Sequence, residues 1–258
     1  LGGLFKKIVI SDTISTGIVD RVFDQPELAS SVETWMAVYG YGIQIFCDFS
    51  GYTDTAIGIA LILGYHLKPN FDQPYKSVTI TEFWRRWHIS LSVWLRDYLY
   101  IPLGGNRKGN VRTYINLLIT MLLGGLWHGA SAKFILWGAL HGGALAIHKF
   151  WCGIAPRISE KIPSWIGWFV TFHFVLFCWI PFRADSFDLS LVVFQHLWLP
   201  APIELIPSVI TQFALVFSML LLGIVLHFLP DRWKDRVDQQ FETAPVGELG
   251  IVTLVSII

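Results

Sequence analysis

Charged residues and the short motifs of common soluble enzymes are both scarce in this sequence. Asp, Glu, Lys and Arg make up 15% of the 258 residues, against about 25% in an ordinary soluble domain. Lys and Arg total 19, as do Asp and Glu, so the formal net charge is zero and no nucleic-acid partner is indicated. The sequence contains no G-x-S-x-G, P-loop or H-E-x-x-H segment. The usual signatures of serine hydrolases, nucleoside triphosphatases and zinc proteases are therefore missing.

Cysteine is also rare, and its three positions form no disulfide or metal pattern. Cys47, Cys152 and Cys178 each lie in or beside an apolar stretch, and no C-x-x-C occurs. We expect free, buried thiols. Eight histidines make zinc conceivable, but no two of them have the i, i+4 spacing of a helical site, so we expect no bound metal.

Internal repeats, low-complexity tracts and a leader peptide are not visible either. No self-similarity occurs at the periods of 20–50 residues that mark repeat proteins. The sequence does not begin with Met, shows no basic segment followed by a short apolar core and cleavage site, and ends in the apolar run VGELGIVTLVSII. We expect one membrane domain over residues 1–258, forming the C-terminal part of a longer chain.

Apolar and aromatic residues are abundant and occur in long runs. Hydrophobic residues make up 53%, with 12 Trp and 19 Phe, and the mean hydropathy is +0.53. This composition indicates an integral membrane protein. Because a spanning helix needs about 20 mostly apolar residues, the candidate spans are 35–64, 113–127, 132–149, 164–182, 208–229 and 246–258. We expect an all-α, polytopic bundle with re-entrant or interfacial helices around a central tunnel.

Two of these spans are unusual. The first is interrupted by the polar stretch CDFSGYTD, so we expect it to be bent or broken. The pair 113–127 and 132–149 is short and is separated by HGAS. At about 1.5 Å per residue, the first of the pair rises roughly 22 Å, which would place His128 at membrane depth.

Basic residues orient the spans. Segment 66–112 holds eight Lys and Arg against three Asp and Glu, which predicts a cytoplasmic location by the positive-inside rule. His128 then lies towards the outer end of its span. Within this segment, residues 80–98 plot as one helix with a Trp-rich apolar stripe that includes His88, which is typical of an interfacial helix. Thr79 or Thr81 can cap its start.

Ionisable residues at membrane depth are functional candidates, because burying them is costly. His128 is the strongest, since it lies between glycines in GGLWHGAS and can exchange a proton near neutral pH. The alternative is a structural histidine at a helix-breaking turn. Judged from its position alone, His88 is more typical of a core histidine, and His141 in GALHGG favours a helix-packing or hydrogen-bonding role. Asp48 can partner a histidine or arginine or line a polar tunnel.

Three longer stretches make the sequence resemble a known family. They are DFSGYTDTAIGIALILGYHLKPNFDQPY, TEFWRRWHISLSVWLRDYLYIPLGGNRKG and LLGGLWHGASAKFILWGALHG. Together they closely resemble the membrane-bound O-acyltransferase family, in particular its bacterial branch that acetylates alginate or transfers D-alanine to teichoic acid. The likeness is dense over about residues 1–150 and mainly hydropathic beyond, with core motifs at 42–150 and further membrane helices at 164–258.

The resemblance implies roles for individual residues. His88 and His128 match the two motif histidines, and His128 matches the one assigned as catalytic. Trp127, His141 and Asp48 are candidates for lining or supporting a tunnel. Arg85, Arg86 and Arg96 are candidates for attracting an anionic donor, with cytoplasmic interface anchoring as an equal alternative.

The function implied is acyl transfer in the bacterial inner membrane. We expect a multi-pass O-acyltransferase that moves an acyl group, in the first place acetyl, from a cytoplasmic thioester to hydroxyls of an exported polysaccharide such as alginate. Acetyl-CoA or an acyl carrier protein would be the donor, with no permanently bound cofactor. Membrane lipids and a periplasmic acetylation protein are the other expected partners. The alternatives are D-alanyl transfer to teichoic acid, acylation of a lipid, a transporter with a His128–Asp48 proton relay, and a scaffold for a periplasmic acetyltransferase.

Overall fold

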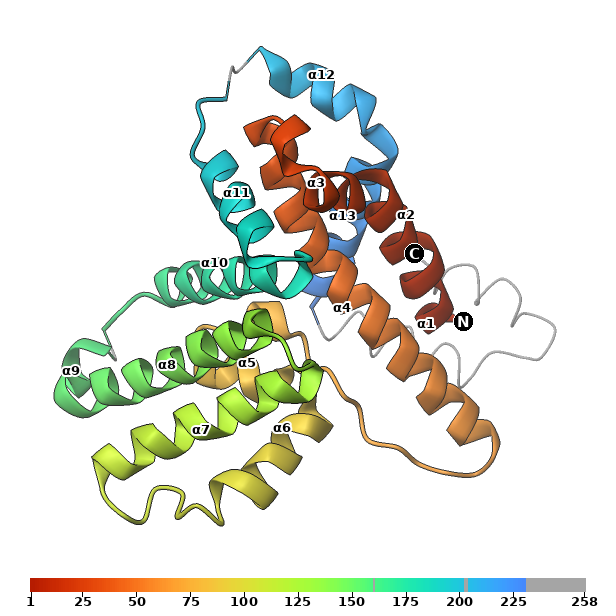
Figure 1. Cartoon of the computed structure of the whole chain (residues 1–258). Helices are drawn as coiled ribbons and strands as arrows, with labels where there is room; N and C mark the ends of the chain where they lie inside the picture. Colours follow the sequence, from red (N-terminus) through yellow and green to blue (C-terminus); the bar gives the residue numbers. More distant parts are fainter. Residues whose placement is uncertain (160, 202–203, 231–258) are drawn as a thin grey trace. The chain divides into compact units, whose positions relative to one another are not determined.

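The computed structural model describes residues 1–159, 161–201 and 204–230, and every regular element in these ranges is helical (Figure 1). The all-α prediction is confirmed. The chain divides into two compact units. Unit 1 comprises Leu1–Arg21, Tyr39–Pro69 and Ala201–Ile258, and unit 2 comprises Val22–Val38 and Asn70–Pro200. The expected span 246–258 lies outside the described residues.

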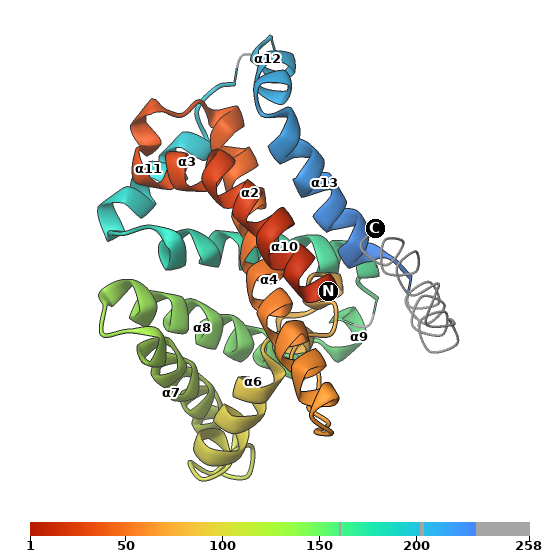
Figure 2. The same ribbon diagram turned by 90° about the vertical axis from the view of Figure 1, so that its right-hand side faces the viewer.

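Unit 1 begins with a helical run that alternates between α and π geometry. Its elements are α1 (Gly2–Leu4), η1 (Phe5–Ser11), α2 (Asp12–Ile14) and η2 (Ser15–Val19), and α3 (Asp20–Asp24) continues from it. The other helices of the unit are most of α4 (Ser31–Ile62), together with α12 (Leu205–Gln212) and α13 (Ala214–Phe228). α13 packs beside η1 and α2 (Figure 2). A Cβ at Gly223 would stand 2.5 Å from the Ile43 side chain, so glycine permits the close packing of α13 on α4.

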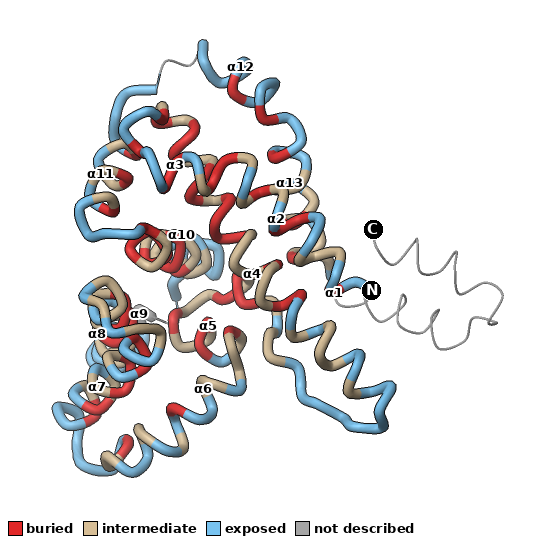
Figure 3. The backbone as a smooth tube through the Cα atoms, turned by 45° about the vertical axis from the view of Figure 1, so that its right-hand side comes forward, coloured by how far each residue is buried: buried red, intermediate tan, exposed pale blue. Residues whose placement is uncertain are grey.

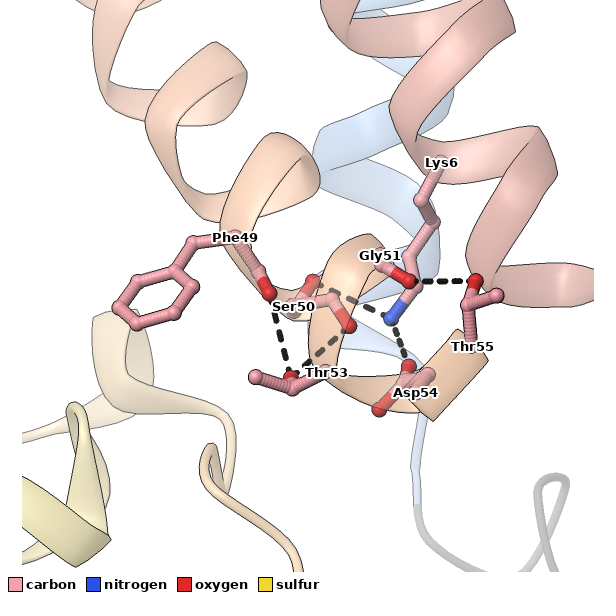
Figure 4. Close-up of polar contacts among 7 residues, drawn as sticks. All are labelled: Lys6, Phe49, Ser50, Gly51, Thr53, Asp54 and Thr55. Atoms are coloured by element: carbon pink, nitrogen blue, oxygen red, sulfur yellow. Dashed lines mark hydrogen bonds and ion pairs between the residues drawn. The ribbon is translucent and has the colours of Figure 1, made fainter. Parts of the chain in front are cut away.

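The N-terminal run of unit 1 is fastened to α4 by a backbone contact and two ion pairs. A Cβ added at either Gly3 or Gly51 would lie 2.5 Å from the carbonyl oxygen of the other glycine. One turn further on, Lys6 pairs with Asp54 and also donates to Ser50 Oγ at 3.1 Å (Figure 4). Lys7 pairs with Asp48. Lysines of the first helices thus neutralise both carboxylates of the CDFSGYTD stretch.

The expected break in the first span does not occur. α4 runs without interruption from Ser31 to Ile62. The hydroxyls of Thr53 and Thr55 bond carbonyls one turn back, on Phe49, Ser50 and Gly51 (Figure 4). The polar residues of this stretch therefore find partners without opening the helix, and the prediction of a broken span was wrong.

Unit 2 contains the remaining elements. After α3 come η3 (Pro26–Leu28) and the start of α4, and residues 70–200 then form a succession of helices. These are η4 (Pro74–Lys76), α5 (Ile80–Arg86), α6 (Ile89–Leu95), η5 (Arg96–Tyr100), α7 (Asn110–His128), α8 (Ala132–Ile154), α9 (Pro156–Ser159), α10 (Ser164–Arg183) and α11 (Phe187–Leu197). Buried and exposed positions alternate along α7 and α8, as expected for two helices that pack through one face each (Figure 3).

Glycines allow α7 and α8 to pack closely. A Cβ at Gly138 would collide with the Met121 carbonyl oxygen and lie 3.0 Å from Leu122 Cα. A Cβ at Gly125 would collide with the Phe134 carbonyl oxygen, and one at Gly142 would lie 3.0 Å from Leu118 Cα. Small residues thus let the two backbones approach each other along much of the hairpin.

Two helices in the described part of the chain are long and apolar enough to cross a membrane: Ser31–Ile62 and Ser164–Arg183. α12 and α13 pass the same test as a pair, with a bend of 85° between them, so the expected span 208–229 is broken at Phe213. The expected short spans 113–127 and 132–149 are helical, within α7 and α8, but are not among these candidates. In α7 the polar residues Thr113, Asn116 and Thr120 dilute the apolar run.

Candidate functional site

His88 lies at a sharp break between α5 and α6. Trp87 ends α5 with extended backbone, and His88 adopts the left-handed conformation, with φ 44° and ψ 58°. The expected single helix over 80–98 was therefore wrong. Two backbone bonds from residues 70–72 satisfy the groups that the break releases: the Ile89 N–H donates to the Asn70 carbonyl, and the Asp72 N–H donates to the Arg86 carbonyl, both at 2.9 Å.

Local capping fixes the start of α5 in front of this break. Thr79 Oγ1 accepts from the Glu82 N–H at 3.1 Å, and Glu82 Oε2 accepts from the Val78 N–H at 2.9 Å. This reciprocal arrangement satisfies two amide groups at the helix start. Of the two caps considered from the sequence, the structure selects Thr79.

His128 is the last residue of α7, at the tip of the α7–α8 hairpin. Gly129 ends the helix with φ 154°, and Ser131, in extended conformation, precedes the first residue of α8. The half-buried imidazole packs against four aromatic rings. Their centroid separations from His128 are 5.0 Å for Trp127, 6.0 Å for Phe134, 5.2 Å for Trp137 and 5.0 Å for Phe182.

Trp127 connects the two histidines. Its ring centroid lies 5.0 Å from that of His128 and 6.2 Å from that of His88, and its side chain is exposed. His88 lies outside the helices that can cross a membrane. Burial and, secondarily, the nearby His128 lower the pKa of His88 to about 4. His88 is therefore a neutral imidazole near pH 7.

His141 is wholly buried in α8, where it joins α8 to α5. Its Nδ1 accepts from the Trp84 indole N–H at 3.3 Å. Its ring lies 4.7 Å from that of Trp137, which itself contacts His128. His141 thus supports the aromatic surroundings of His128 from behind. The sequence around His141 favours a role in helix packing or hydrogen bonding, and this bond between α5 and α8 is a contact of that kind.

The three candidate donor-binding arginines have different surroundings. Arg86 pairs with Glu82 at 2.9 Å and with Asp72 at 3.7 Å. Arg96 pairs with its neighbour Asp97 at 2.7 Å, with both side chains largely exposed. Arg85 is exposed and has no ion pair among the described residues. Their role in attracting a donor stays a prediction.

Asp48 belongs to unit 1 and forms its ion pair with Lys7. The seven other predicted site residues all lie in unit 2, on α5, η5, α7 and α8 and at the turn between α5 and α6. Sequence reasoning missed Phe134, Trp137 and Phe182, since aromatic residues are common throughout this chain. It also missed Asn70, which is hydrogen-bonded to the turn at His88 but precedes His88 by 18 residues in the sequence.

Similarity to known proteins identifies the class to which this arrangement of helices and histidines belongs. Residues 3–185 match the family model described as "MBOAT, membrane-bound O-acyltransferase family". The chain belongs to this family and is a membrane protein. The match includes every unit 2 residue of the predicted site.

Curated proteins with three named activities are similar to the chain. The chain is 48% identical over 188 residues to the "Probable alginate O-acetylase AlgI" of Pseudomonas fluorescens, covering 73% of this chain and 37% of that protein. It is 44% identical over 193 residues to the "Peptidoglycan O-acetyltransferase" of Helicobacter pylori, covering 75% and 36%. It is 31% identical over 179 residues to the "Teichoic acid D-alanyltransferase" of Streptococcus thermophilus, covering 62% and 43%. The chain thus spans well under half the length of these relatives.

Proposed function

We propose that the complete protein is a multi-pass O-acyltransferase of the bacterial inner membrane, which acetylates hydroxyls of an exported polysaccharide such as alginate. The observation that carries this proposal is the half-buried His128 imidazole, held among four aromatic rings and near a second, neutral histidine. The names of the relatives with 44–49% identity support acetyl transfer to a polymer.

The proposed reaction needs a base and no metal. The acceptor hydroxyl oxygen attacks the carbonyl carbon of a thioester, acetyl-CoA or an acyl carrier protein, while His128 takes the hydroxyl proton. The new C–O bond forms, the C–S bond breaks, and the proton passes from His128 to the leaving thiolate. General base catalysis of this kind contributes roughly 10²- to 10⁴-fold. His88, Trp127 and His141 hold or line the reaction site, and a periplasmic protein receives or presents the polymer.

The test is replacement of His128 in the natural, complete gene product. His128→Gln keeps a polar side chain of similar size but removes the base, and we expect acetyl ester on the exported polymer to fall by roughly 10²-fold or more. His66→Gln is the matched control, because His66 is exposed and belongs to unit 1, whereas both motif histidines belong to unit 2. Unchanged acetylation in His128→Gln at normal protein level would sink the assignment.

D-alanyl transfer to teichoic acid is the second candidate, supported by relatives at 31% identity. Mass spectrometry of the polymer separates the two, because an acetyl ester and a D-alanyl ester differ in mass and only the second carries an amine. A transporter or scaffold role predicts no transfer that depends on His128. Solute flux without acyl transfer from the purified protein would favour the transporter.

A further inference from the structure

Asn70 places one amide oxygen against three hydrogen-bond donors at the turn between α5 and α6. Its Oδ1 accepts from the Ser90 backbone N–H at 3.0 Å and from the Ser90 hydroxyl at 2.9 Å. The same oxygen lies 3.3 Å from His88 Nδ1. Its backbone carbonyl accepts from the Ile89 N–H at 2.9 Å. Asn70 therefore bonds the residue at the break and both residues that follow it.

The Ser90 backbone bond fixes which way the Asn70 amide faces. A backbone N–H can only donate, so the Asn70 atom opposite it is the oxygen and not the NH₂ group. That oxygen can only accept, so His88 Nδ1 must donate to it and must carry a proton. The Ser90 hydroxyl, 3.4 Å from Nδ1, gives its own proton to Asn70 and can accept from Nδ1 as well.

We propose that Asn70 is a positioning residue for the acyl transfer: it holds His88 in the Nδ1–H tautomer, so that Nε2 carries the lone pair and acts as a hydrogen-bond acceptor. This inference rests on the proposed function. A neutral ring has one proton, and the second nitrogen of a histidine is set by the bond that the first one makes. His88 then accepts a hydrogen bond from a hydroxyl or an N–H, and it does not donate one to the thioester carbonyl through Nε2.

The surroundings of the turn agree with this role. The charged groups next to it are Asp72 and Arg86, which pair with each other, and the titratable ring near it is His128. Arg86 has Asp72 and Glu82 as partners, and the Asn70 amide oxygen and the Ser90 hydroxyl lie 3.3 Å and 3.4 Å from His88 Nδ1. Backbone groups on both sides of His88 are bonded from outside the turn: Asn70 accepts from the Ile89 N–H, and the Asp72 N–H donates to the Arg86 carbonyl.

The decisive experiment compares Asn70→Ala and Asn70→Asp in the complete natural protein. Asn70→Ala removes the acceptor, and we expect a loss of transfer of about 10- to 100-fold, the scale seen when a group that orients a metal-binding histidine is removed. Asn70→Asp keeps an oxygen for all three donors and adds a negative charge, which raises the pKa of His88. Transfer should then persist at high pH, with its acid limb moved upward by about one unit or more.

Controls separate this inference from the proposed function. Asn106→Ala removes another side-chain amide oxygen that accepts a hydrogen bond, from the Tyr100 hydroxyl at 2.6 Å, and should stay within twofold of the wild type. Equal transfer by wild type and His128→Gln would refute the proposed function. With His128→Gln inactive, an Asn70→Ala variant within twofold of wild type would refute the positioning role alone.

The positioning role of Asn70 can be tested even if the Asn70→Ala variant folds poorly. If Asn70→Ala lowers the amount of protein in the membrane, the pH profile of Asn70→Asp decides, because that variant keeps every acceptor bond of the turn. A purely structural Asn70 gives an Asn70→Asp profile that superimposes on the wild type, and this result would overturn the proposal.

Discussion

Substitution of Gly138 by alanine should separate α7 from α8 and weaken the site at their tip. The added Cβ would collide with the Met121 carbonyl oxygen and lie 3.0 Å from Leu122 Cα, against an ordinary carbon contact of about 3.5–4.0 Å. Both neighbours are backbone atoms, so no side-chain rotation relieves the contact, and the helices must move apart by roughly 1 Å to restore ordinary contact distances. Overpacking of this kind costs typically about 1–3 kcal/mol.

The same helix offers a matched control at Gly143. A Cβ there meets no atom within 4 Å, so alanine should stabilise the helix by its better propensity, by roughly 0.5–1 kcal/mol. Gly138→Ala gains the same propensity term but carries the overpacking cost. The two substitutions, five residues apart, should therefore shift stability in opposite directions.

Thermal unfolding in detergent, followed by loss of the monodisperse protein, measures the difference. At roughly 2–4 °C per kcal/mol for a chain of this size, Gly138→Ala should lower the midpoint by a few degrees and Gly143→Ala should raise it slightly. Acetyl transfer should fall in Gly138→Ala, since Phe134 and Trp137 on α8 pack against His128 on α7. A Gly138→Ala protein at least as stable as Gly143→Ala would refute the close-packing argument.

Three further predictions concern single interactions. His88→Asn should lower the rate of transfer but leave the shape of its pH profile between pH 5 and 8 unchanged, because the pKa of His88 is about 4 and the ring is already neutral in this range. A pH–rate profile of the variant that loses or shifts a limb between pH 5 and 8 would count against the low pKa. Lys7→Asp or Asp48→Lys alone should destabilise unit 1 by up to about 1 kcal/mol because both side chains are partly exposed, and the double exchange should restore the melting temperature; equal melting of single and double variants would contradict the pairing. Thr79→Ala should cost about 1 kcal/mol by removing the cap of α5 while Thr79→Ser keeps it, and melting curves that do not distinguish the two would argue against the cap.

The long apolar segments were predictable because their length alone defines them. The run 164–182 corresponds to α10, Ser164–Arg183, and the hairpin on either side of HGAS lies within α7 and α8. The break between α12 and α13 was not predictable, since the sequence at Phe213 holds neither glycine nor proline. Hydropathy identifies apolar segments, but it does not predict where the helix axis bends within such a segment.

The two errors near polar residues share a physical cause. Residues 80–98 have a helical pattern, and the break at His88 depends on bonds from Asn70 and Asp72, which lie many residues earlier in the sequence. The CDFSGYTD stretch has a pattern typical of a break, but Lys6 and Lys7 satisfy its carboxylates from another helix. In both cases a distant partner decides the local backbone.

Some residues of the candidate site could be predicted from the sequence and others could not. His128, His88, His141 and Trp127 come together in unit 2, on elements that the motifs already mark. Phe134, Trp137 and Phe182 complete the surroundings of His128, but nothing distinguishes them by sequence from the many other aromatic residues. Tertiary packing selects these three rings, and periodicity cannot show which rings meet.

The left-handed backbone of His88 limits which residues can replace it in natural or laboratory variants. Asparagine, aspartate and glycine tolerate φ near 44°, whereas other side chains incur a backbone strain of about 1–2 kcal/mol. A valine or isoleucine at this codon would lose the imidazole and strain the turn together, while asparagine would lose the imidazole alone. Most substitutions found in a genetic screen at position 88 will therefore combine backbone strain with loss of the imidazole. The asparagine variant is the one that shows the effect of losing the imidazole without the strain.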